Sequence, residues 1–186
     1  KIPSFVKPYI ELTQKMAFLI AQMDKSAIKS IKIEAEGEIG DYLDSLNTFA
    51  TVGALTTALS NEKINYVNAT FIADEKNIKL DASKVANNSG YKNKVTVKIT
   101  TTNGVNSVSG TIFNEDVQRI IAINNFIMDI EPSGKMILVT NSDIPGVIGE
   151  VGKTLGDNSI NISDFRLGRN DAGALAVILV DNEVTK

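Results

Sequence analysis

Residues 141–147 bring together the side chains and backbone groups best suited to binding a small charged molecule. Asn141 and Asp143 follow a predicted strand, and Gly146 and Val147 begin a predicted helix. The first N–H groups of a helix have no partner within it and carry partial positive charge, so they suit a carboxylate. Asp143 can bind an ammonium group. This segment, called the strand–helix corner below, therefore predicts a site for a zwitterion, although sequence alone favours the simpler role of Asp143 as a helix cap.

Asn161 is a further polar candidate, on the strand predicted after that helix. Ile160 and Ile162 flank it, and because successive side chains of a strand point to opposite faces, Asn161 faces away from the core. The next inward apolar residue is Phe165, and this spacing of three predicts a β-bulge near Ser163-Asp164, a feature often found beside sites. From the residues alone, a solvated asparagine is the favoured interpretation.

The predicted helix over residues 146–157 carries two stripes of residues. The first is apolar and is expected to face the core; it consists of Val147, Ile148, Val151 and Leu155. The second consists of Gly149, Gly152 and Gly156. Each interior glycine destabilises a helix by about 0.5–1 kcal/mol relative to alanine, so we expect a closely packed backbone or a ligand to offset the loss. Packing is the favoured explanation.

The composition of the chain excludes several classes of function. Its 19 basic and 22 acidic residues give a net charge of −3 over 186 residues, which argues against nucleic acid as a partner. The absence of cysteine excludes disulfides and thiolate-held zinc or iron–sulfur clusters in this chain. The absence of histidine removes the commonest general base and metal ligand, so we expect no catalytic residue and no metal site. No apolar run approaches the roughly 20 residues of a membrane helix, so we expect a soluble, cytoplasmic protein without a membrane partner.

The first 133 residues are predicted to form an α+β domain. Helical spacing predicts helices from Lys7 to about Met23, from a cap at Asp44 or Ser45 to about Leu59, and from Asn68 to Glu75. Alternation predicts strands at 31–36, 94–100, 105–113, 119–123 and 126–130, with hairpin turns at Asn103-Gly104 and Asn124-Asn125. We therefore expect helices first and then a largely antiparallel sheet.

A second domain is predicted over residues 134–186, after a break at Pro132-Ser133-Gly134. It has the element order βαββ, with strands at 136–140, 160–168 and 174–180 around the helix at 146–157. The first and last of these strands are almost continuously apolar, which indicates that both faces of their sheet are buried. Another subunit is the favoured cover, and a neighbouring domain is the alternative.

Several short motifs resemble the C-terminal regulatory region of long-form D-3-phosphoglycerate dehydrogenases. Residues 137–169 are similar to the ACT domain, an amino-acid-sensing module of the ferredoxin-like order βαββαβ. The other motifs are Lys7-Pro8-Tyr9-Ile10-Glu11-Leu12, Tyr66-Val67-Asn68-Ala69, Gly110-Thr111-Ile112-Phe113 and Arg119-Ile120-Ile121. The resemblance covers the whole chain, and implies an allosteric substrate-binding domain over 1–133 and an ACT domain over 134–186 that lacks its last helix and strand. Together with Lys1 at the first position, it leads us to expect a fragment of a longer protein.

The resemblance also implies a function and a set of residues. The family oxidises 3-phosphoglycerate with NAD in serine biosynthesis, and many members are inhibited by L-serine bound at ACT–ACT contacts. By position, Asn141, Asp143 and Asn161 match the serine-contacting places, with Asn161 reaching a ligand held mainly by the partner subunit. Arg119 is the one candidate for an anion site in the first domain, where Phe126 and Glu131 are not basic.

The leading hypothesis is therefore a non-catalytic regulatory fragment that binds L-serine at an ACT dimer interface, with NAD bound only by the parent enzyme. A homo-oligomer through the ACT sheet faces is expected. One alternative is an oligomerisation module without an effector response. Another is a regulatory part of an iron–sulfur L-serine dehydratase, whose cluster this cysteine-free chain cannot hold.

Overall fold

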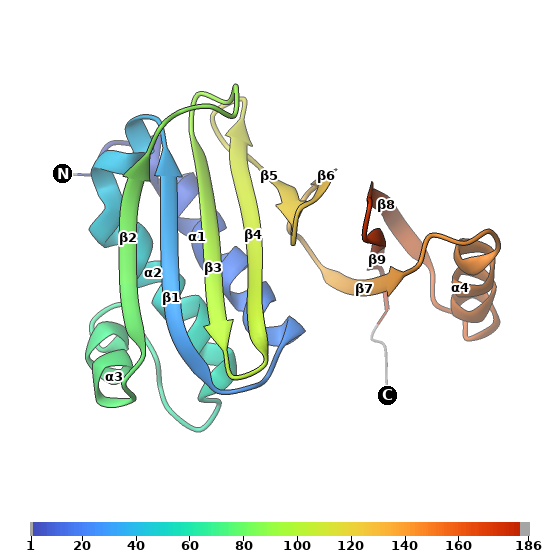
Figure 1. The fold of residues 1–186 in the computed structure, drawn as a ribbon, viewed down its shortest axis with the longest axis horizontal. Coiled ribbons are helices and arrows are strands. Elements are labelled where there is room, and N and C mark those ends of the chain that lie inside the picture. Colours follow the sequence, from blue (N-terminus) through green and yellow to red (C-terminus); the bar gives the residue numbers. More distant parts are fainter. Residues whose placement is uncertain (1, 183–186) are drawn as a thin grey trace.

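Alternating apolar and polar residues produce the larger of two β-sheets in the computed structural model, which describes residues 2–182 (Figure 1). Its strands are β1 (Ile28–Glu36), β2 (Lys79–Val85), β3 (Lys94–Thr101), β4 (Gly104–Phe113), β5 (Val117–Ile123) and β6 (Phe126–Ile130). They lie in the order β2-β1-β3-β4-β5-β6, and only the β1–β2 pair is parallel. The predicted α+β class with a largely antiparallel sheet is confirmed.

The helices of this first unit are α1 (Val6–Met23), α2 (Leu43–Ala58) and the short α3 (Ala69–Glu75). α1 and α2 cover one face of the sheet, and α3 lies near one end of it (Figure 1). All three predicted helices are confirmed. The predicted cap at Asp44 or Ser45 is wrong, because a 3-10 helix (Glu38–Tyr42) runs directly into α2 and leaves Tyr42 at the cap position without a capping hydrogen bond.

The core lies between these helices and the covered face of the sheet. Ile31 and Ile33 of β1 are fully buried, as the alternation predicts, and so are Leu12 and Met16 of α1. The two helices approach closely at Gly53 of α2, where a Cβ atom would lie 2.2 Å from the carbonyl oxygen of Gln14.

Both predicted hairpins form, but one turn differs in register. Asn124 and Asn125 have φ values of 46° and 65°, as expected for a two-residue turn between β5 and β6. In the β3–β4 hairpin, Thr101 pairs with Gly104, so the turn residues are Thr102 and Asn103 rather than Asn103-Gly104. Gly104, with φ of 142°, instead begins β4.

The smaller unit follows the predicted order βαββ. It consists of β7 (Lys135–Asn141), α4 (Val147–Asp157), β8 (Ile162–Asn170) and β9 (Gly173–Val180), and its sheet order is β7-β9-β8 with antiparallel pairing. The register shift between Ile162 and Asp164 confirms the predicted bulge. The division into domains at 133/134 stays a prediction.

Strand β9 is almost continuously apolar because both of its faces are packed against other elements. Its residues Leu175, Val177 and Leu179 belong to the same hydrophobic cluster as the core of the first unit. Residues Ala176, Ile178 and Val180 instead pack with Leu155 of α4. The first unit therefore covers the second face of this sheet, and a second subunit is not needed to explain the run.

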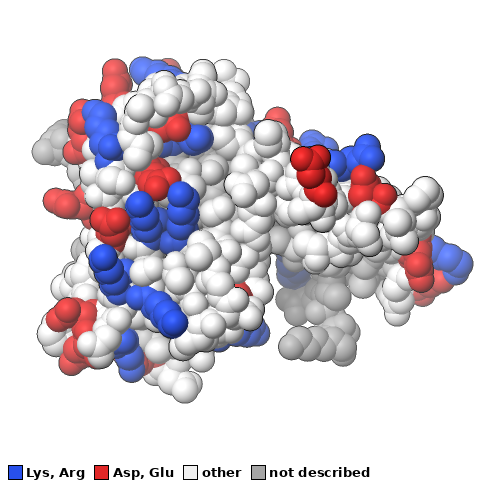
Figure 2. Space-filling view, viewed as in Figure 1, with Lys and Arg blue, Asp and Glu red and all other residues white. Residues whose placement is uncertain are grey.

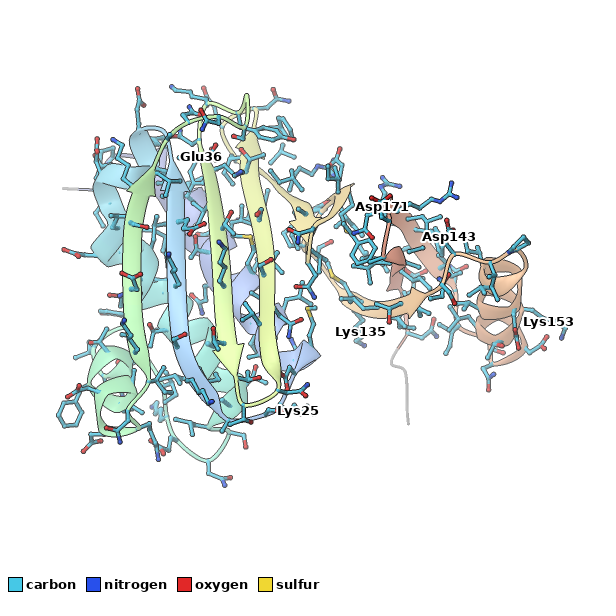
Figure 3. All side chains as sticks on the ribbon, viewed as in Figure 1. Lys25, Glu36, Lys135, Asp143, Lys153 and Asp171 are labelled. Carbon is cyan, nitrogen blue, oxygen red and sulfur yellow. The ribbon has the colours of Figure 1, made fainter. Side chains whose placement is uncertain are left out.

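Glu36, at the end of β1, is a buried carboxylate held by several donors (Figure 3). Its Oε2 accepts hydrogen bonds from the Ser89 backbone N–H, at 3.2 Å, and from the Ser89 hydroxyl, and its Oε1 lies 3.0 Å from Lys94 Nζ. Burial acts to raise the pKa of Glu36, but the Ser89 hydrogen bonds and the Lys94 charge outweigh it and lower the pKa below 4.5.

This lowered pKa predicts a pH dependence of stability. A depressed folded-state pKa contributes stability above the unfolded value near 4.5, and that contribution is lost as pH falls through the folded value. We expect Glu36→Gln to lower the free energy of unfolding by about 1–3 kcal/mol at pH 7, and by less at pH 3. Urea unfolding from pH 3 to 7 measures the difference. Glu75→Gln, at an exposed position of α3, is the control. A loss for Glu36→Gln that is independent of pH would contradict this account.

Candidate functional site

The strand–helix corner lies at one end of the three-stranded sheet (Figure 3). β7 ends at Asn141, whose backbone pairs with Ala174 of β9, and α4 begins at Val147. The tip between β8 and β9 lies against the same place, since a Cβ atom at Gly173 would come 2.4 Å from the carbonyl oxygen of Asn141. The corner is therefore bordered by three segments: the end of β7, the start of α4 and the β8–β9 turn.

The backbone of the corner is fixed by a local turn. Asn141 Oδ1 accepts a hydrogen bond of 2.6 Å from the N–H of Asp143, which has a left-handed φ of 58°. Gly146 occupies the cap position of α4 with φ of 95° and no side-chain cap. A Cβ atom at Gly146 would meet nothing within 4 Å. The start of α4 at Val147 is thus open to an incoming acceptor group.

Asp143 does not cap the helix, so that interpretation is wrong. Its Oδ2 is instead bound by Arg169 of β8, with Nε at 2.8 Å and Nη2 at 2.7 Å. The pairing arises because Asn141 and Arg169 both lie opposite Ala174, on the two sides of β9. Sequence reasoning missed Arg169, since only the strand register brings it to the corner.

Asn161 lies at the opposite end of the sheet from the other predicted residues. It immediately precedes β8, where Ile162 pairs with Val180, six positions along β9 from Ala174. At about 3.3 Å per residue, the two ends are about 20 Å apart. Asn161 is exposed, and its Nδ2 donates to Asp181 Oδ2 at 2.5 Å.

The structure thus brings Asn141, Asp143, Gly146 and Val147 together and does not bring Asn161 to them within one chain. The expectation that Asn161 acts on a ligand held by another copy is compatible with this separation and stays a prediction.

Helix α4 is more exposed than its apolar stripe and its glycine stripe predict. Leu155 is buried, whereas Ile148, predicted for the core, is 44% exposed. Cβ atoms built at Gly149, Gly152 and Gly156 would meet nothing within 4 Å. The favoured expectation of a closely packed neighbour at these glycines is therefore wrong for the part of the chain that the structure describes. The exposed Ile148 and the open glycines form an uncovered surface on α4.

Arg119, the predicted anion residue, has an acidic neighbour. Its Nε lies 3.5 Å from Asp129 Oδ1 of β6, and its side chain is 28% exposed. This carboxylate offsets the charge that an anion would need. The anion site stays a prediction, and the geometry gives it no support.

Lysine side chains gather over the exposed face of the larger sheet, interspersed with acidic ones (Figure 2). Its lysines alternate with carboxylates: Glu34 lies 2.8 Å from Lys98 and 3.2 Å from Lys32. The hydrogen bond from Lys98, with a smaller one from Lys32, lowers the pKa of Glu34 despite partial burial. These pairs neutralise the face, so it does not form an anion-binding stripe.

Residues 2–182 also bear on metal binding and on membrane insertion. No group of three or more acidic side chains there is arranged to hold a metal ion. Within the same range, no helix is both long and apolar enough to cross a membrane.

Comparisons with known proteins extend these observations. The family model of the D-3-phosphoglycerate dehydrogenase intervening domain matches residues 5–124. The chain is 32% identical to D-3-phosphoglycerate dehydrogenase of Bacillus subtilis over 94% of its own length and 33% of that protein. It is 30% identical to the Synechocystis enzyme of the same name over 88% of the chain and 30% of that protein. The Archaeoglobus fulgidus enzyme is 29% identical over 97% of the chain and 35% of its own length. The chain thus spans about a third of the length of these relatives.

Proposed function

The chain belongs to the D-3-phosphoglycerate dehydrogenase intervening-domain family, and from this premise we propose that it is a non-catalytic regulatory part of such a dehydrogenase. The parent protein would oxidise 3-phosphoglycerate in the cytoplasm, with NAD bound outside this chain. The names of the relatives favour this hypothesis over the iron–sulfur dehydratase.

The proposed ligand of the strand–helix corner is L-serine. One observation carries this proposal: an acidic side chain and an uncapped helix start lie within one exposed turn. The amides at Gly146 and Val147 would bind the α-carboxylate, because a helix start favours negative charge. Asp143 would bind the ammonium group, and Asn141 would hold the turn that presents it.

Asn161 of the partner subunit would complete the site. Because Asn161 lies at the other end of the sheet in its own chain, it can contribute only if two ACT units pair so that opposite ends meet. A ligand bound across such a contact favours the paired state, and this differential affinity would alter the mobility of the catalytic domains.

Calorimetry with L-serine and the 186-residue chain tests the proposal. We expect saturable binding, and Asp143→Ala should weaken it at least about tenfold, since hydrogen bonds to charged groups contribute about 1.5–3 kcal/mol. Asp157→Ala, at the far end of α4, is the matched control and should bind as the wild type does. No detectable heat at millimolar L-serine, or equal binding by Asp143→Ala, would contradict the proposal.

The uncovered surface on α4 favours a second candidate, an assembly module without an effector response. Ile144 and Ile148 are 60% and 44% exposed beside the open glycine stripe, which suits a contact with another copy. Sedimentation measurements separate the two: association that is unchanged by L-serine supports the module, and association that L-serine strengthens supports the sensor.

A further inference from the structure

The pairing of Asp143 with Arg169 places both charges needed to recognise a free amino acid at one corner. Nε of Arg169 donates a hydrogen bond of 2.8 Å to Oδ2 of Asp143, and Nη2 lies 2.7 Å from the same oxygen. Within residues 2–182, no hydrogen bond or ion pair uses Oδ1 of Asp143. The Arg169 side chain is 67% exposed, so its outer edge faces solvent.

Arg169 and Asp143 keep hydrogen-bonding groups that a ligand could use. A guanidinium has five N–H donors in a planar fork, and a carboxylate accepts through both oxygens. Asp143 Oδ2 engages Nε and lies beside Nη2, which leaves at least three N–H donors of Arg169 for another acceptor. The free Oδ1 of Asp143 can at the same time accept from an ammonium group. The ion pair can thus bind a zwitterion without being broken.

We propose that Arg169 is a specificity-determining residue of the effector site and binds the α-carboxylate of the amino acid together with the helix-start amides. This inference rests on the proposed function, because it concerns the same ligand. A planar fork binds a carboxylate through two hydrogen bonds, which an uncharged amide or hydroxyl of a ligand cannot match. Arg169 therefore selects for a free carboxylate, while Asp143 selects for the ammonium group.

The matched probes are L-serine and L-serinamide, which differ only in the carboxylate. Calorimetry on the 186-residue chain compares wild type with Arg169→Gln, which keeps a polar side chain but removes the charge. We expect Arg169→Gln to weaken L-serine binding at least about tenfold and to leave L-serinamide binding unchanged or tighter, since the substitution removes a positive charge beside the ammonium group. Arg166→Gln, on the same strand and paired with Asp164, is the control and should change neither affinity.

The outcomes distinguish this inference from the proposed function. If the wild type binds L-serine and Arg169→Gln binds it equally well, the inference is wrong and the serine site stands. If Arg169→Gln weakens both probes alike, Arg169 only positions Asp143, and the inference is also wrong. No binding of L-serine by the wild type would overturn both. Partial recovery of L-serine binding by Arg169→Lys, with thermal unfolding unchanged, would support the role of the charge.

Discussion

Replacing Gly53 with alanine is expected to lower the free energy of unfolding by about 3 kcal/mol, near the upper end for overpacked cores. Gly53 lies on α2 where it crosses α1, and the added Cβ would stand 2.2 Å from the Gln14 carbonyl oxygen and 3.1 Å from the Phe18 nitrogen. Both are backbone atoms, so no side chain can rotate away and the two helices must separate. Urea unfolding measures the loss.

The control for this prediction is the same substitution in another helix. Gly152 of α4 also lies inside a helix, but a Cβ there would meet nothing within 4 Å. Gly152→Ala is therefore expected to raise the free energy of unfolding by about 0.5–1 kcal/mol, through helix propensity alone. Equal effects of the two substitutions would show that the α1–α2 contact is looser than described.

Val177→Asp is expected to lower the free energy of unfolding by at least about 3 kcal/mol, because it leaves an unpaired charge in a closed core. Val177 is fully buried on β9 and belongs to the core cluster of the first unit. The substitution should therefore reduce hydrogen-exchange protection in β4 and β5 as well as in β9. Val105→Asp, at a strand position that is 60% exposed, should change little.

The same substitution tests which surface covers β9. If the first unit of the same chain covers it, unfolding of the wild type does not depend on protein concentration. A midpoint that rises with concentration, together with protection of β4 and β5 that Val177→Asp leaves intact, would mean that a second subunit supplies the cover instead.

Local periodicity was sufficient to predict most elements of the fold. The three helices of the first unit and the strands β1 and β3 to β6 all carry a helical or alternating repeat in their own residues. The order βαββ of the second unit was also predicted from local patterns. The wrong predictions concern residue patterns that are compatible with more than one local structure. Asp44 and Ser45 have capping side chains, but a preceding 3-10 helix took the place of a cap. Asn103-Gly104 marks a turn without fixing its register.

The candidate site was only partly predictable for a related reason. Asn141, Asp143, Gly146 and Val147 are close in sequence, so their proximity follows from one turn. The contact between Asp143 and Arg169 spans 26 positions and depends on two strand pairings with β9. The separation of Asn161 from the corner depends on the same register, which no local pattern specifies.

The shared packing of β9 limits how this protein can be taken apart. Alternate residues of β9 pack in two different cores. If residues 134–182 were separated from the rest of the chain, the side chains that pack in the first core would become an exposed apolar surface. A fusion of that segment to another protein would need polar substitutions at Leu175, Val177 and Leu179 to remain soluble. A change of side-chain size at any of these three positions must therefore be accommodated by the core of the first unit.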